Sequence, residues 1–212
     1  AVDNTFLSPH FQKPLTLGAD IVLHSGTKYL CGHNDVIAGF LVLKDATSAQ
    51  AKRIELLAKS AGPNLSALDS WLMRSIKTRG VRVERQAENA LAIARWLGTL
   101  PEVTEVLYPG LADHPGYALQ QKQASGAGGM ISFKVRSAEL AKAALGKLHL
   151  IAFAESLGGV ETLLTYPIAQ THAEMPAALL KRTGLDDKLL RLSVGIEDVE
   201  DLKTDLQQAL QG

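Results

Sequence analysis

The sequence of 212 residues predicts an α/β fold in two parts. Short apolar runs end abruptly in small polar residues, as buried parallel strands do, and residues 19–24 are the clearest case. Other stretches place apolar residues three and four positions apart, which is typical of a helix with one buried face. The pattern changes near residues 76–82, so we expect a domain boundary there, between residues 1–76 and residues 77–212.

The first part is expected to alternate strands and helices. Apolar runs predict strands over residues 19–24 and 36–43. Asp45 opens a helical stretch, which Gly62-Pro63-Asn64 interrupts because this triplet favours a turn. Helical spacing of the apolar residues then resumes, which predicts a second helix over residues 65–76.

The second part mixes strands and helices. Gly98 stands where a glycine commonly ends a helix. Glu197 and Asp198 place negative charge at the start of the last helix, where it suits the helix dipole. The expected strands cover residues 103–108, 130–135, 153–157 and 189–194, and the expected helices cover residues 83–97, 138–148 and 199–210.

Composition excludes several classes of protein. Hydrophobic residues make up 46% and charged residues 21%, as in globular proteins, so a disordered or collagen-like chain is excluded. The 22 basic and 22 acidic residues cancel, so we expect no nucleic-acid and no membrane partner. The longest apolar run, residues 36–43, is far shorter than the roughly 18–20 residues that span a bilayer.

The single cysteine and the first residues indicate where the chain comes from. Cys31 allows no disulfide within the chain, which favours a reducing, cytoplasmic location. The chain begins with Ala1-Val2-Asp3, which resembles the end of a strand and lacks Met. We therefore expect a fragment of a longer protein.

The stretch from Asp20 to His33 holds the most informative polar residues. Ser25, Thr27 and Lys28 follow the end of a predicted strand, where hydroxyl groups and backbone N–H groups can hold a phosphate. The lysine amine could pair with an anion or, once desolvated, act as a nucleophile. A polar turn with a solvated lysine explains the same residues, because so short a pattern recurs by chance.

Three further places could carry chemistry. Asp3 follows apolar residues, where a carboxylate can bind a ligand nitrogen or simply close an Asx turn. Arg191 alternates with Leu190 and Leu192 on a predicted strand, so it needs an acidic partner. That partner is either a substrate carboxylate or a structural ion pair. Ser156 precedes glycines that permit either the close approach of a ligand or a tight turn.

Together these segments resemble the Cys/Met-metabolism family of pyridoxal-phosphate enzymes. That family includes cystathionine synthases, cystathionine lyases and O-acylhomoserine sulfhydrylases. The resemblance extends over essentially the whole chain, with the motifs in the family's order and spacing. The matching segments are residues 2–6, 18–29, 32–35, 154–161, 170–172 and 191–198.

The resemblance implies the α/β fold of fold-type I enzymes, pyridoxal 5′-phosphate as cofactor and no metal. Lys28 would bind the cofactor covalently and, once displaced by the substrate amine, act as the base. Asp3 would pair with the pyridine nitrogen and keep it protonated. Ser25 and Thr27 would bind the cofactor phosphate.

The resemblance also implies a small amino acid as the substrate. Arg191 would clamp its α-carboxylate, with Ser156 and Glu155 in the same site. Glu155 resembles the residue that γ-synthases and γ-lyases carry at this position, whereas enterobacterial β-lyases carry an aromatic residue there. Residues 165–167 and 170–172 resemble the corresponding segments of bacterial γ-synthases. The implied reaction is γ-replacement or γ-elimination on an O-acylhomoserine or cystathionine. A cystathionine β-lyase or γ-lyase is the main alternative.

The same resemblance assigns the two parts of the chain. Residues 1–76 would end the cofactor domain, and residues 77–212 would form a smaller domain, with an antiparallel or mixed sheet and helices on one face. Family members form homo-oligomers, commonly homotetramers, and carry an additional N-terminal half that completes the phosphate site. The alternative from another class is an inactive fragment that only folds or assembles with a partner.

Overall fold

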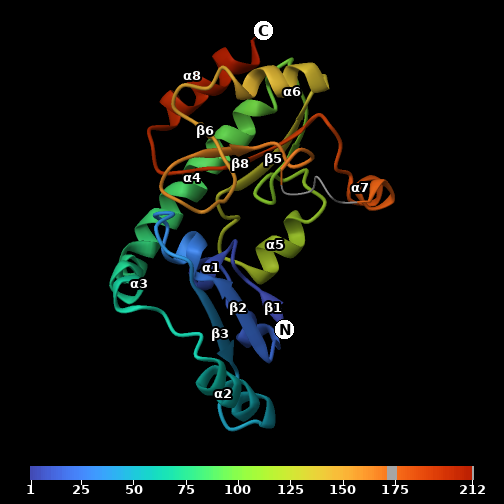
Figure 1. Ribbon diagram of the computed structural model, residues 1–212. Helices are drawn as coiled ribbons and strands as arrows, with labels where there is room; N and C mark the ends of the chain where they lie inside the picture. The colour runs from blue at the N-terminus through green and yellow to red at the C-terminus, as the bar shows by residue number, and fades with distance from the viewer. Residues whose placement is uncertain (171–175, 212) are drawn as a thin grey trace.

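The computed structural model describes residues 1–170 and 176–211, which form two β-sheets joined by the long helix α4 (Arg79–Leu97). The first sheet lies with the N-terminus in the lower half of Figure 1, and the second lies above it. Helix α4 begins beside the part of the chain that holds the first sheet and packs against the second sheet, so it links the two parts (Figure 1).

The first sheet has the strand order β1-β2-β3. β1 runs parallel to β2, with Val2 opposite Val22, and β3 runs antiparallel to β2. The strands are β1 (Val2–Asp3), β2 (Ile21–Ser25) and β3 (Gly39–Leu43), and the helical segments are α1 (Ser8–Phe11), the 3-10 helix η1 (Pro14–Leu17), the π-turn η2 (Gly26–Leu30), α2 (Ala49–Ala61), α3 (Ala67–Leu72) and the 3-10 helix η3 (Met73–Thr78).

The second sheet is mixed, with the order β4-β5-β8-β7-β6. β6 and β7 pair parallel, and the other neighbours pair antiparallel. The strands are β4 (Val103–Leu107), β5 (Met130–Val135), β6 (Ala152–Phe153), β7 (Leu163–Thr165) and β8 (Leu189–Ser193), and the helices are α5 (Tyr117–Gln123), α6 (Ala138–Leu145), α7 (Ala177–Thr183) and α8 (Val199–Leu210).

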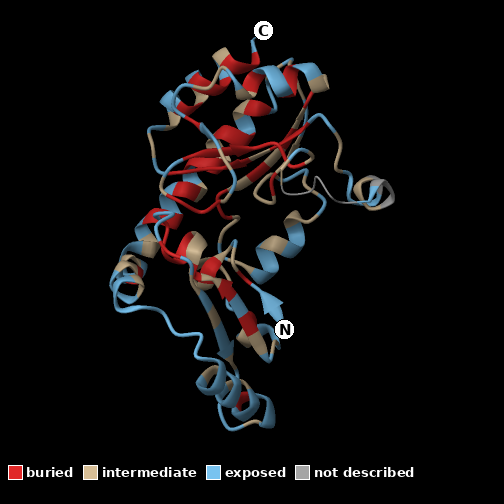
Figure 2. Ribbon diagram, in the orientation of Figure 1, coloured by how far each residue is buried: buried red, intermediate tan, exposed pale blue. Residues whose placement is uncertain are grey.

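One face of the second sheet carries the main core. Ile131, Phe133 and Val135 of β5 are fully buried, because alternate residues of a strand point to the same face. They pack with α4, α6 and α8, and the buried residues gather between these helices and the sheet (Figure 2). The predicted mixed sheet is therefore confirmed.

The α/β class and most predicted elements are confirmed, but several boundaries differ. The strand predicted over residues 36–43 begins only at Gly39. The strand predicted over residues 153–157 ends at Phe153, because the chain then turns and Ser156 adopts a φ of +92°, outside the strand region. The helix predicted over residues 65–76 consists of α3 followed by η3.

Other differences concern short elements. The helix predicted over residues 138–148 ends at Leu145. β7 and α5 were not predicted, and β7 has only three residues, too few to show a period. Within residues 1–170 and 176–211, no helix is long and apolar enough to cross a membrane, and no group of three or more His, Cys, Asp or Glu residues could hold a metal ion.

Candidate active site

Lys28 lies in the π-turn η2, directly after β2. Its backbone dihedrals, φ −93° and ψ −130°, interrupt the helical geometry of the turn. Its Nζ donates a hydrogen bond of 2.8 Å to Ser156 Oγ, 128 residues further along the chain. The structure therefore brings together two residues that were predicted from separate segments.

The surroundings of Lys28 favour its neutral form. Burial lowers the pKa of its amine, and the positive charge of Arg191 lowers this pKa further. A lower pKa leaves more neutral amine near neutral pH, and this is the form that attacks a carbonyl group. The half-buried amine, bonded to Ser156, differs from the solvated lysine that a simple polar turn would present.

Ser156 lies in a short segment, residues 156–160, which we call the Ser156 loop. Its positive φ is uncommon for a residue with a side chain, and such conformations persist only where the surrounding structure holds them. At Gly158 an added Cβ would lie only 2.7 Å from the backbone nitrogen of Tyr29, so a side chain there would collide. The N–H of Gly158 donates to Ser193 Oγ at 2.8 Å. The loop therefore packs directly on the turn that carries the lysine.

Arg191 occupies the middle of β8, opposite Thr165 of β7. Its Nε is buried and has no hydrogen-bond partner among the described residues, and its Nη2 makes one long contact of 3.4 Å to Thr165 Oγ1. Burial lowers the pKa of the guanidinium, and Tyr29 and Glu155 act in the opposite direction. No carboxylate in residues 1–170 and 176–211 forms an ion pair with it. These residues thus offer no partner for a structural ion pair.

Asp3 closes an Asx turn at the end of β1. Its Oδ1 accepts hydrogen bonds from the N–H and the hydroxyl of Thr5, at 2.9 and 2.6 Å. Thr5 Oγ1 in turn accepts from the N–H of Ser25 at 2.8 Å, so the ends of β1 and β2 are held together. The turn uses only Oδ1, so it does not exclude a ligand on the exposed carboxylate.

One cavity joins several of the predicted residues. It measures about 490 Å³, and Asp3, Ser25 and Lys28 line it together with residues 4–7 and Leu157. Ser156 reaches it through its hydrogen bond to the lysine.

Thr27, Glu155 and Arg191 do not line this cavity. Thr27 Oγ1 accepts from the N–H of Ala38 at 3.0 Å and points its hydroxyl at the carbonyl of Ala38, at 3.4 Å. Glu155 is exposed and acts on Arg191 only through its charge. The motif at residues 170–172 extends beyond the described residues, except for Gln170, whose Oε1 accepts from the N–H of Tyr166 at 2.8 Å.

Sequence reasoning missed the buried polar side chains that support the site. Tyr29 is 1% exposed, directly after Lys28, and Ser193 is 2% exposed. Arg82, Gln86 and Asn89 of α4 are buried as well. The signal for these three is their spacing of four and three residues, which places them on one face beside the apolar residues of α4.

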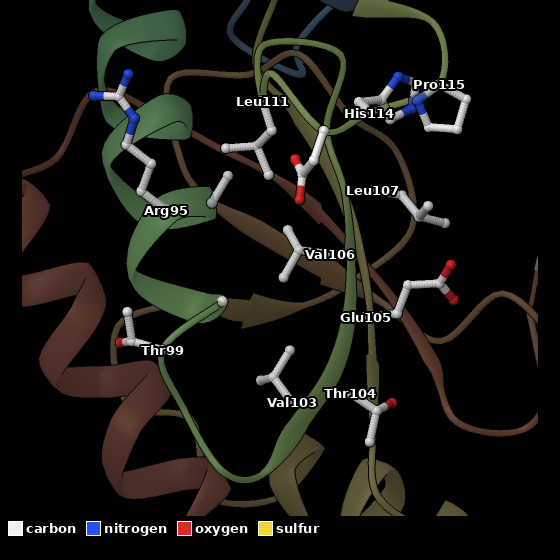
Figure 3. Close-up of a pocket in the computed structure, with 13 residues that line it drawn as sticks. Arg95, Thr99, Val103, Thr104, Glu105, Val106, Leu107, Leu111, His114 and Pro115 are labelled. Carbon is white, nitrogen blue, oxygen red and sulfur yellow. The ribbon is translucent and has the colours of Figure 1, made fainter.

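A larger cavity of about 690 Å³ lies elsewhere, beside the end of α4 and the edge strand β4. Figure 3 shows Arg95 of α4 at the left, Val106 of β4 near the centre, and Glu105 and His114 on the right. None of the predicted site residues lines this cavity. The chemistry-bearing groups gather instead around Lys28.

Comparisons with known proteins show which proteins this chain is similar to. The cystathionine gamma-lyase of Bacillus subtilis (strain 168) is 50% identical over 211 residues, which cover 99% of this chain and 55% of that protein. The cystathionine beta-lyase of Lactococcus lactis subsp. cremoris (strain MG1363) is 47% identical with the same coverage. The solved structure of cystathionine gamma synthase from Xanthomonas oryzae pv. oryzae in complex with aminoacrylate and cysteine matches with a TM-score of 0.93 at 45% identity, over 99% of this chain and 54% of that chain.

The chain thus spans about half the length of these relatives. The family model for Cys/Met metabolism PLP-dependent enzymes matches residues 1–211. Both findings agree with the family expected from the motifs, and the chain belongs to the Cys/Met metabolism family of PLP-dependent enzymes.

Proposed function

We propose that this chain forms part of a pyridoxal-phosphate-dependent transsulfuration enzyme of the cystathionine γ-synthase type. The reaction would replace or eliminate the group on the γ-carbon of an O-acylhomoserine or of cystathionine. The observation that carries this proposal is the amine of Lys28, half-buried at a cavity, bonded to Ser156 and held beside the guanidinium of Arg191. An amine poised as a nucleophile beside a cation suits an amino-acid substrate that carries a carboxylate.

The residues that line the cavity fit pyridoxal phosphate. Lys28 supplies an amine for its aldehyde, and the carboxylate of Asp3 can accept a bond from its pyridine nitrogen. Ser25 offers a hydroxyl that makes no hydrogen bond to any described residue, which suits a phosphate oxygen. Thr27 fits less well, because its hydroxyl group already contacts Ala38 and would have to turn.

Once bound, the cofactor would supply an electron sink for the negative charge that develops at the substrate α-carbon. Lys28 would then take the α-proton on Nζ. Its lowered pKa favours the neutral amine, which is the form that can accept a proton. Ser156 Oγ would hold this Nζ in place. Arg191 would bind the substrate α-carboxylate through its two-pronged guanidinium, whose Nε has no partner among the described residues.

A cystathionine β-lyase or γ-lyase is the second candidate, because a γ-lyase relative (50% identical) and a β-lyase relative (47%) are as similar to the chain as a γ-synthase relative (48%). Glu155, exposed next to Ser156, is the feature that favours a γ-type enzyme.

We also propose that the full-length protein is a cytoplasmic homo-oligomer. An inactive chain that assembles only with a partner remains the candidate from another class.

Product analysis of the full-length protein separates these candidates. Cystathionine is supplied with pyridoxal phosphate, and pyruvate and 2-oxobutyrate are measured separately. A γ-lyase releases 2-oxobutyrate from cystathionine, whereas a β-lyase releases pyruvate. Formation of cystathionine from an O-acylhomoserine and cysteine identifies the synthase, and the absence of all three activities would leave the inactive assembly.

A chemical test addresses the cofactor directly. The full-length protein is reduced with borohydride in the presence of pyridoxal phosphate, and the modified peptide is identified by mass spectrometry. We expect the cofactor on Lys28. Attachment to a different lysine, or none, would contradict the assignment of this residue.

A further inference from the structure

Helix α4 presents a buried polar face that the proposed chemistry does not use. Arg82, Gln86 and Asn89 are 5%, 0% and 2% exposed, respectively. Their spacing of four and three residues places them on the same side of the helix. Buried polar side chains are costly unless they form hydrogen bonds, so the partners of these three indicate their role.

Each of the three side chains donates to main-chain carbonyl groups of another segment. Arg82 donates to the carbonyls of Tyr29 and Leu30, at 3.2 and 3.1 Å, directly after Lys28. Asn89 donates to the carbonyls of residues 195 and 197, at 3.2 and 2.9 Å, beyond the end of β8. The helix therefore anchors several segments around the site.

Gln86 anchors the Ser156 loop. Its Nε2 donates to the carbonyl of Gly159 at 2.6 Å, three residues after Ser156. The loop is also held by the bond from the Gly158 N–H to Ser193, and by a bond of 2.9 Å from its residue 160 to the carbonyl of residue 32. These hydrogen bonds hold the loop against the turn that carries the lysine.

We propose that Gln86 is a positioning residue for Lys28: it holds the Ser156 loop on the turn η2, so that Ser156 Oγ stays within hydrogen-bond distance of Lys28 Nζ. Gln86 and Arg82, one helical turn apart, fix the loop and the turn from a single rigid helix. Gln86 Oε1 is buried and has no partner among the described residues, a cost that an apolar residue at this position would avoid. The proposal matters for catalysis only if Lys28 has the proposed function.

The experiment measures the titration of the Lys28 amine in the full-length protein freed of cofactor. Competitive labelling with acetic anhydride over a range of pH, with peptide mass spectrometry, gives the midpoint for each lysine. The charged groups near this amine are Arg191 of β8 and Asp3 of β1, with Glu155 beyond Arg191, and all of them stay in place in the variants below.

Gln86→Met keeps the length of the side chain and removes the donor. The Ser156 loop should then move away and admit water, so the labelling midpoint of Lys28 should rise. A rise of one unit slows labelling near neutral pH about tenfold. Asn89→Leu is the control, because it removes a buried amide of the same helix that donates to residues 195 and 197 and makes no hydrogen bond to the loop or the turn. We expect this variant to lower the melting temperature and to leave the midpoint unchanged.

An unchanged midpoint in Gln86→Met, or an equal rise in both variants, would overturn the proposal and leave Gln86 as a merely structural residue. If Gln86→Met does not fold, Gln86→Asn replaces it, since its amide is too short to reach Gly159 and the same rise is expected. Borohydride trapping on the unmodified protein keeps the two proposals distinct. If the labelling midpoint of Lys28 rises in Gln86→Met but borohydride trapping finds no cofactor on Lys28, the proposed function is refuted and the positioning role is supported.

Discussion

Lys28 is the residue on which the proposed chemistry depends most. Lys28→Arg keeps a positive charge, but a guanidinium stays protonated and cannot serve as nucleophile or base near neutral pH. We expect turnover of the full-length enzyme to fall by several orders of magnitude, measured with cystathionine as substrate. Lys44→Arg, at an exposed position, is the control and should leave turnover unchanged. Activity above about a tenth of normal, a loss of less than ~1.4 kcal/mol, would exclude Lys28 from the chemical step.

Arg191 is expected to recognise substrate and to contribute little to folding. Arg191→Lys keeps the charge that lowers the pKa of Lys28, but a lysine cannot bind a carboxylate with two parallel hydrogen bonds. The substrate should lose about 1.5–3 kcal/mol of binding free energy, which is measured as a higher Michaelis constant for the amino acid. Absorbance of the bound cofactor and the melting temperature should hardly change. A large fall in melting temperature with an unchanged Michaelis constant would identify a structural ion pair instead.

Some residues of the candidate site could be predicted from the sequence, and others could not. Lys28, Asp3 and Ser25 were singled out as polar residues at the ends of predicted strands, and the family resemblance assigned them to one site. The structure places all three around one cavity. Gln86 was missed. A buried glutamine on a helix looks like any polar position until the segment that supplies its partner, 73 residues away, is placed beside it.

Among the helices, α8 illustrates how one carboxylate can organise a neighbouring segment. Asp205 accepts from the N–H groups of His149, Leu150 and Ile151, at 2.9, 2.9 and 2.8 Å, just before β6. Burial by itself would raise the pKa of Asp205, but these bonds outweigh it and hold the pKa below its ordinary value. The carboxylate thus fixes the segment that enters the second sheet.

Asp205→Asn should destabilise the protein by about 1.5–3 kcal/mol near neutral pH, because an amide cannot accept all three bonds. A lowered carboxyl pKa stabilises the folded state above the ordinary pKa, and this contribution disappears as pH falls through the folded-state pKa. The difference in unfolding free energy between the two proteins should therefore shrink in acid, as measured by urea unfolding. Asp201→Asn, exposed in the first turn of the same helix, is the control and should show a much smaller difference, because only a weak helix-dipole interaction is lost there. A difference independent of pH would contradict the role of the charge.

The predicted elements were most accurate where period and length are clear. β5 alternates buried and half-buried residues over six positions, and its predicted bounds are correct. The strand predicted over residues 153–157 failed because the Ser156 loop is shaped by tertiary contacts. Gly158 fits only against Tyr29, and its N–H bonds to Ser193, neither of which is close in sequence. The local pattern therefore could not place the loop.

The molecule as a whole is unevenly covered. The second sheet is packed under three helices, whereas the strands of the first sheet are mostly half-buried or exposed (Figure 2). Leu23, Leu41 and Val42 are 37%, 49% and 43% exposed. Parallel strands such as β1 and β2 usually lie in sheets that are covered on both faces. The relatives are about twice as long as the chain, so we expect the rest of the full-length protein to cover this sheet.

Covering of the first sheet can be tested with a single introduced thiol. Cys31 is fully buried, so Leu41→Cys provides the reactive cysteine for a maleimide reagent. The thiol should react quickly in the 212-residue chain and at least tenfold more slowly in the full-length protein, because covering residues then exclude the reagent. Gln207→Cys, exposed on α8, is the control and should react quickly in both. Equal, fast labelling of Leu41→Cys in both proteins would show that β3 stays open to solvent in the complete molecule.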